Sequence, residues 1–226
     1  PIMKKTRLAV ALTLAALTAL PMTTVHAYEK GDLILRAGPA NVDPDSSSSA
    51  ISLGGAELPG TGVSVDGDTK IGITATYMLN EHFGVGLLAS TPFQHDITES
   101  GLGIGRIGST RHLPPTLSIQ YFPMNSASNF QPYFGVGANY TTFFDEETDP
   151  GLDGALGDST LKLDDSFGIA LELGADYWIN EKWALNAAIW MIDIDTDAVI
   201  SSPAGEVTVD VEIDPVVYMI GAAYRF

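Results

Sequence analysis

The stretch FQPYFGVGANYTTFF, residues 130–144, alternates apolar side chains with small or polar ones. The apolar set is Phe130, Pro132, Phe134, Val136, Ala138 and Tyr140, and the other set is Gln131, Tyr133, Gly135, Gly137, Asn139 and Thr141. Successive side chains of a β-strand point to opposite faces of the sheet. The stretch therefore predicts a strand with one apolar face and one face of small or polar residues.

The same period of two recurs along the chain and completes a set of eight predicted strands. The other segments are DLILRAG (32–38), KIGITATYML (70–79), FGVGLLASTPF (83–93), LSIQYF (117–122), SFGIALELGADYWI (166–179), WALNAAIWM (183–191) and VVYMIGAAYRF (216–226). Short turns at 80–82, 123–129 and 180–182 alternate with long polar loops near 42–66, 96–110, 145–163 and 199–208. This pattern is typical of an all-β fold in which eight antiparallel strands form an outer-membrane β-barrel, with short periplasmic turns and long extracellular loops. A soluble β-sandwich also alternates and remains the alternative.

Aromatic residues favour the barrel, because they gather near both ends of the predicted strands. Those beside the short turns are Tyr77, Phe83, Tyr121, Phe130, Tyr177, Trp183, Tyr224 and Phe226, and those toward the long loops are Phe93, Tyr140 and Phe144. Two such girdles are expected where a barrel meets the two membrane interfaces.

The N-terminus has the features of a secretory signal peptide, predicted here as residues 1–27. Three basic residues precede the apolar run LAVALTLAALTAL (8–20), and the small-residue boundary Val25-His26-Ala27 follows it. The run has too few residues to cross about 30 Å of hydrocarbon as a helix. Pro1 and Ile2 precede Met3 and are interpreted as residues added before the natural start. Residues 28–226 are then expected to form a single barrel domain.

Composition excludes several classes of protein. The formal net charge of −17 argues against nucleic-acid binding, which requires a basic surface. Cysteine is absent from the sequence, so disulfides, thiol catalysis and cysteine-ligated metals are excluded. We expect no cofactor and an exported, strongly acidic protein.

The chain resembles the OmpW family of eight-stranded outer-membrane proteins over its whole length after residue 27. The resemblance is carried by RAGPANVDP (36–44), HLPPTLSIQYF (112–122), QPYFGVGANYT (131–141), GADYWIN (174–180) and GAAYRF (221–226). It implies a monomeric barrel that admits small, often hydrophobic molecules through the outer membrane without energy input. The C-terminal strand ending in Phe226 also resembles the signal that the outer-membrane insertion machinery reads.

Side-chain parity predicts a hydrophobic funnel at the extracellular mouth. Along 183–197 the outward series changes from apolar residues to Asp193, Asp195 and Asp197, so lipid should end near Asp193. The inward residues at this level are apolar in both of the last two strands. They are Trp190, Ile192, Ile194, Val209, Val211 and Ile213. The alternative is that they only form a small core that holds the hairpin together.

The inward parity changes to charged residues in the periplasmic half. Arg36, Glu172, Asp176 and Arg225 fall on the lumen face there. An eight-stranded barrel is only just wide enough for side chains to fill, and opposite charges in that space should pair. We therefore expect a polar, ion-paired floor beneath the funnel.

Three prolines suggest an exit above this floor. Pro92 lies at the extracellular end of the third predicted strand, and Pro114 and Pro115 lie at the start of the fourth. Each proline removes a donor from the hydrogen-bond ladder, so the two neighbouring strands should separate or bulge. We interpret this as a lateral opening from the funnel into the outer leaflet. The alternative is that the prolines only end the paired region at the loop.

The sequence also bears on functions other than this channel. Inward Asn139, Asn186, Thr74 and Thr76 keep open a lumen path for small polar solutes such as neutral amino acids, and a plugged structural or surface-recognition barrel is a further alternative.

Catalysis is not expected, because Ser90 and Ser109 near His95 and His112 make no evident nucleophile and base arrangement. No metal site is expected either, although His95 and His112 could approach each other near Asp96 or Glu99. The acidic loop 145–158 lacks EF-hand spacing and is expected to be a solvated face near lipopolysaccharide. The glycines of GLGIGRIG (101–108) lack the helix that dinucleotide binding requires.

Overall fold

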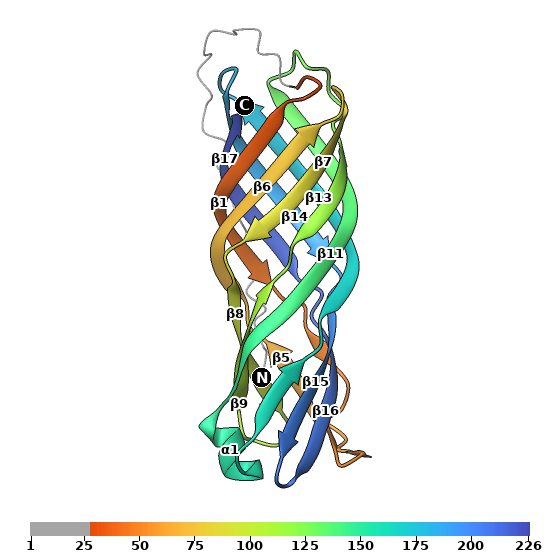
Figure 1. The fold of residues 1–226 in the computed structure, drawn as a ribbon, viewed down its shortest axis with the longest axis vertical. Helices are drawn as coiled ribbons and strands as arrows, with labels where there is room; N and C mark the ends of the chain where they lie inside the picture. The colour runs from red at the N-terminus through yellow and green to blue at the C-terminus, as the bar shows by residue number, and fades with distance from the viewer. Residues whose placement is uncertain (1–27) are drawn as a thin grey trace, which may run out of the picture.

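Eight strands close into an antiparallel barrel in the order β1–β6–β7–β10–β11–β13–β14–β17 and back to β1 (Figure 1). The computed structural model describes residues 28–226, so the predicted signal peptide lies outside the described residues. The barrel strands are β1 (Leu33–Asp43), β6 (Asp68–Met78), β7 (Phe83–Ser90), β10 (Thr116–Tyr121), β11 (Phe130–Thr148), β13 (Ser166–Trp178), β14 (Trp183–Ile192) and β17 (Val216–Arg225). The predicted fold class is confirmed.

The segments predicted as long polar loops are largely regular structure, which corrects that part of the prediction. They contain β2 (Ser47–Ser48), β3 (Ser52–Leu53), β4 (Ala56–Glu57), β5 (Gly62–Val65), β8 (Phe93–Ser100), β9 (Arg106–Leu113), α1 (Pro150–Leu156), β12 (Thr160–Leu163), β15 (Asp195–Ser202) and β16 (Gly205–Glu212). These elements extend the barrel at the end opposite the C-terminus, the lower end in Figure 1. The hairpins β8–β9 and β15–β16 continue the walls there because their backbone groups pair with each other.

The outer surface of the barrel is apolar and the inside of its walls is buried. Leu173 and Ile220 are 61% and 71% exposed, whereas the neighbouring inward residues Glu172 and Met219 are buried. So much exposed apolar surface on a closed sheet fits a lipid environment and does not fit a soluble sandwich, which buries its apolar faces between two sheets. Within residues 28–226, no helix is long and apolar enough to span a membrane.

Phe93 is the one predicted girdle residue that the structure places inside. The strand predicted over 83–93 ends at Ser90, and β8 begins at Phe93. Thr91 and Pro92 between them are both exposed, so the alternation of faces shifts by one residue at this break. Phe93 is only 2% exposed and contacts the interior, and its prediction as a lipid-facing aromatic is wrong.

The fold predicts the sidedness of single cysteines, since the natural sequence has none. Ala155→Cys, exposed in α1, should react with a membrane-impermeant maleimide in intact cells. Ala127→Cys, exposed in the turn between β10 and β11, should react only after the outer membrane is opened. Labelling of Ala127→Cys but not of Ala155→Cys in intact cells would show the opposite orientation.

Candidate functional site: an apolar funnel above a polar floor

The extracellular extension encloses an apolar cavity. It holds about 540 Å³ of empty space when the part open to solvent is counted. All six residues predicted for the funnel are buried, and Val209, Val211 and Ile213 line the cavity. Trp190, Ile192 and Ile194 are buried on the same inward face without belonging to that lining.

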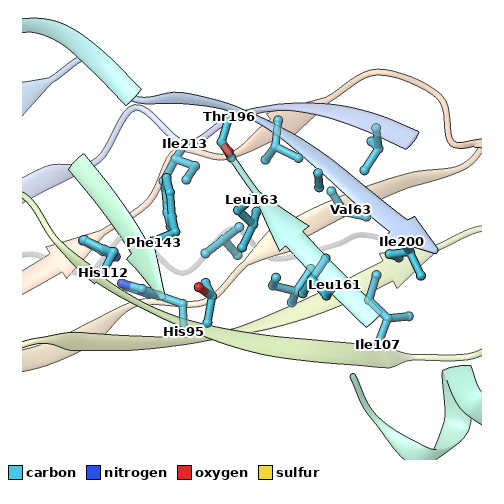
Figure 2. Close-up of a pocket in the computed structure, with 16 residues that line it drawn as sticks. Val63, His95, Ile107, His112, Phe143, Leu161, Leu163, Thr196, Ile200 and Ile213 are labelled. Carbon is cyan, nitrogen blue, oxygen red and sulfur yellow. The ribbon is translucent and has the colours of Figure 1, made fainter. Parts of the chain in front are cut away.

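Half of the residues that line the cavity lie in segments predicted as loops. The additional lining residues are Val63, Val65, His95, Ile97, Ile107, Thr110, His112, Phe143, Leu161, Leu163, Thr196, Ala198 and Ile200 (Figure 2). A second apolar cavity, toward the tip, shares Ile107 and Ile200 with the first and reaches Leu152 and Leu156 of α1. The signal that was available is the period of two in short stretches such as GVSV (62–65) and TLKL (160–163), which lie within long polar segments.

The floor of the barrel is a buried ion pair. Arg36 in β1 donates from Nη2 to Asp176 Oδ2 in β13 at 2.6 Å, with a second contact from Nε to Oδ1 at 3.0 Å. Both side chains are fully buried. Asn186 Nδ2 donates to the same carboxylate at 2.8 Å, and the Arg36 guanidinium lies 4.9 Å from the centre of the Tyr133 ring. The charges are therefore paired and hydrogen-bonded, as burial requires.

A chain of hydrogen bonds carries this floor across the lumen to Glu172. Arg36 Nη1 donates to the Thr76 hydroxyl at 2.7 Å, and that hydroxyl donates to Gln120 Oε1 at 2.8 Å. Gln120 Nε2 then donates to the Glu172 carboxylate at 2.8 Å. Glycine leaves room for these side chains, because a Cβ at Gly86 would lie 2.5 Å from Gln120 Nε2. The layer closes the lumen with side chains from β1, β6, β10 and β13.

Arg225 lies nearer the periplasmic end than the other three predicted floor residues. It contacts Asp32 at 3.6 Å and lies over the Trp178 ring, 5.5 Å from its centre. An aromatic layer that the sequence analysis missed caps the floor here: Tyr28 packs against Phe122 and Trp178 and donates from its hydroxyl to Asp176 Oδ2 at 2.5 Å. Tyr28 precedes the first strand, so no strand parity could have placed it.

The strand ladder is interrupted at the three prolines. Pairing of β7 with β10 stops at Leu88 and Thr116, and pairing of β8 with β9 begins at Phe93 and His112. The carbonyls of Pro114 and Pro115 accept from donors outside the β7–β10 ladder. Pro115 O accepts from Tyr140 N at 3.1 Å and from Asn139 Nδ2 at 3.3 Å, and Pro114 O accepts from the Thr116 hydroxyl at 3.2 Å.

The remaining polar residues on the inward face have different surroundings. Thr76 and Asn186 belong to the floor, Asn139 supports the proline break, and the Thr74 hydroxyl has no hydrogen-bond partner among the described residues. Within residues 28–226, no hydrogen bond joins Ser90 or Ser109 to His95 or His112. His95 and His112 do approach each other, and they line the cavity with nearly parallel rings whose centres are 4.7 Å apart.

The acidic side chains considered as metal ligands near the histidines are engaged elsewhere. Asp96 pairs with Arg106 at 3.1 Å, and Glu99 accepts from the backbone N–H groups of Leu102, Ile104 and Gly105. Although burial alone would raise it, these N–H groups hold the pKa of Glu99 below its usual value. Asp193, Asp195 and Asp214 do lie together at the start of the extension, but they are exposed, and a surface cluster of carboxylates alone does not define a metal site.

Comparison with known proteins agrees with this geometry. The model of the OmpW family matches residues 29–226. The chain is 44% identical over 216 residues to outer membrane protein W of Vibrio cholerae, covering 94% of this chain and 97% of that protein. It is 30% identical over 203 residues to outer membrane protein AlkL of Ectopseudomonas oleovorans, covering 88% and 84%. The crystal structure of OprG from Pseudomonas aeruginosa superposes with a TM-score of 0.86 at 47% identity, covering 89% of this chain and 99% of that one.

A closed eight-stranded barrel with an apolar outer belt, a buried polar floor and such neighbours is an outer-membrane protein. The chain belongs to the OmpW family, as the resemblance predicted.

The floor predicts that breaking a buried ion pair lowers the free energy of unfolding more than breaking an exposed one. Asp176→Asn leaves the Arg36 charge buried and unpaired, and should lower the free energy of unfolding by about 3–5 kcal/mol. The control is Asp145→Asn, which breaks the exposed pair with Arg111 and should cost about 1 kcal/mol or less. Urea unfolding of each variant in lipid vesicles measures the difference. Equal effects of the two substitutions would show that the floor pair does not hold the barrel interior together.

Proposed function

We propose that this barrel is a passive channel that admits small, mainly hydrophobic molecules into the extracellular funnel and releases them sideways between β7 and β10. The observation that carries the proposal is the order of three features along the barrel axis. An apolar cavity lies at the extracellular end, a break in the strand ladder lies at its base, and a closed polar layer lies below.

The cavity supports an apolar solute because of its wall. Aliphatic side chains such as Ile97, Leu163 and Val211 dominate it, and the wall hydroxyls of Thr110 and Thr196 are taken up by backbone carbonyls. Burial of apolar surface contributes about 25 cal/mol per Å², so a hydrocarbon surface gains by leaving water here. A charged solute would lose its hydration without finding a partner.

The floor supports a sideways exit because the straight path is costly for such a solute. Passing Arg36 and Asp176 requires the pair to separate inside the barrel, which exposes two charges in a narrow space. At the proline break, by contrast, the pairing of β7 with β10 already ends at Leu88 and Thr116, so no ladder bonds between these strands need to break there. The solute would then enter the lipopolysaccharide leaflet directly.

The lateral route predicts that restoring ladder donors slows apolar uptake. Pro92→Ala, and Pro114→Ala combined with Pro115→Ala, should allow the ladder to close, each recovered hydrogen bond contributing about 0.5–1.5 kcal/mol. Vesicles with an outer leaflet of lipopolysaccharide provide the assay, since plain lipid does not hold back hydrocarbons. Uptake of an apolar solute should fall, while uptake of a small polar solute and the stability of the barrel are unchanged. Pro123→Ala, in the exposed periplasmic turn, is the matched control and should leave both fluxes unchanged.

The floor predicts the reverse result in the same assay. Arg36→Ala or Asp176→Ala removes one member of the plug and should raise the flux of small polar solutes such as neutral amino acids, with little change for the apolar solute. If the proline variants leave apolar flux unchanged and the floor variants raise it, the solute passes straight through the lumen. If no variant changes the flux of either solute from the protein-free level, the barrel is a plugged structural or recognition protein.

We also propose that the C-terminal strand is read by the barrel insertion machinery. Phe226 is 66% exposed on the outer face, and its ring contacts Tyr224 edge-on, 4.7 Å between centres. Deleting Phe226 should lower the amount of protein inserted in the outer membrane, and Phe226→Tyr should preserve it. Equal membrane levels for the deletion and the natural chain would contradict this role.

A further inference from the structure

The base of the funnel contains two buried imidazoles beside the proline break. His112 forms the first ladder pair above the break, with Phe93, and His95 lies one inward position further along β8. The two histidine rings are stacked, with centres 4.7 Å apart and planes within 9° (Figure 2). Phe93 and Phe143 flank the His112 ring at 5.6 and 5.9 Å between centres, so the stack is part of an aromatic wall.

Each imidazole presents a ring nitrogen without a partner. His95 and His112 are 2% and 4% exposed, and Nε2 of each has no hydrogen-bond partner among residues 28–226. Nδ1 of His95 contacts the carbonyl of Asp66, which can only accept, so Nδ1 carries the proton of the neutral ring. Nε2 of His95 is therefore a hydrogen-bond acceptor in a cavity whose threonine hydroxyls, those of Thr110 and Thr196, are already engaged.

Both rings are neutral under ordinary conditions. Burial lowers the pKa of His95 below its usual value, against the effect of its hydrogen bond to Asp66. Burial and the neighbouring His95 lower the pKa of His112 to about 3. The site therefore offers neutral imidazole nitrogens and no positive charge to hold an anion.

The unpartnered nitrogens of His95 and His112 favour some chemical groups of a solute over others. A hydrocarbon leaves both nitrogens without a partner, which is unfavourable in a buried site. A carboxylate has no donor for His95 Nε2, and an ammonium group brings a charge into an apolar cavity. A hydroxyl group is neutral and supplies the missing donor, and an aromatic ring attached to it can pack against Phe93 and Phe143.

We propose that His95 and His112 form a hydroxyl-binding subsite at the base of the funnel, and that the solutes preferred there are phenols. The inference rests on the proposed function, because it specifies which molecules the funnel holds just before the lateral exit. The subsite also explains why a polar pair occupies the one position where the apolar cavity meets the ladder break.

Phenol and toluene provide the direct test, because they have nearly the same shape and differ by a hydroxyl in place of a methyl group. Binding of each to the purified barrel in lipid nanodiscs, with ¹⁵N-labelled histidine, gives an affinity and a resonance for each ring nitrogen. Phenol should bind about 2- to 10-fold more tightly than toluene, the value expected for one hydrogen bond. Phenol should also shift the Nε2 resonance of His95, and toluene should not.

Variants of His95 identify the atom involved. His95→Asn keeps a donor near the Nδ1 position for the Asp66 carbonyl but removes Nε2, and should abolish the preference for phenol while toluene still binds. His95→Gln keeps a polar group near the Nε2 position and should retain part of the preference. His82→Asn is the matched control, since His82 Nδ1 also contacts a backbone carbonyl, that of Phe122 at 2.7 Å, but lies at a periplasmic turn. It should leave the preference unchanged.

The outcomes separate this inference from the proposed function. If phenol and toluene bind equally to the natural chain, or if phenol leaves the His95 Nε2 resonance unmoved, the subsite does not exist although the apolar funnel does. If neither solute binds, the funnel itself is not a solute site and the proposed function fails with it. If His95→Asn does not fold, the resonance shift in the natural chain still decides the question.

Discussion

Closure of the backbone hydrogen-bond ladder is the constraint on which the rest of this structure depends. Hydrocarbon offers no partner to an N–H or C=O group, so a sheet can cross the membrane only if its first and last strands pair. Here β1 pairs with β17 along most of its length, and every barrel strand has two neighbours. The apolar outer face is a consequence, because alternation sends one set of side chains to lipid and the other to the lumen.

A closed ring of eight strands leaves little space inside, and this determines where a solute can go. At the level of Arg36 and Asp176 the lumen holds two charges that pair with each other and with neighbouring polar side chains. Above the membrane the constraint is relaxed, since water can satisfy backbone groups and the wall need not be continuous. The apolar cavity lies in that upper part, and the break at Pro92 and Pro114 lies at its base, where the barrel strands end. On the proposed route, His95 and His112 beside the break are the polar groups that a solute would meet between the funnel and the membrane.

Local alternation in the sequence was enough to predict the barrel. It failed for side chains whose positions depend on contacts between residues far apart in the sequence. It placed the eight barrel strands, the inward faces of Trp190 and Val211, and Arg36 and Asp176 on the lumen face. It did not place Phe93, because two exposed residues at the break shift the parity of the residues after them. It also did not place Tyr28, which caps the floor from outside any strand, or pair Glu172 with Gln120. Contacts across a lumen depend on register and strand tilt, which alternation in a single strand does not encode.

The central claim is that apolar solutes pass while the lumen stays closed, and one paired measurement tests it directly. Ion conductance and apolar uptake are recorded on the same preparation of the natural chain, in bilayers with a lipopolysaccharide outer leaflet. The account predicts apolar uptake above the protein-free level, without any conductance step above that of the protein-free bilayer. Conductance steps that rise with protein content together with apolar uptake would show that both use an open lumen, and would contradict the closed floor.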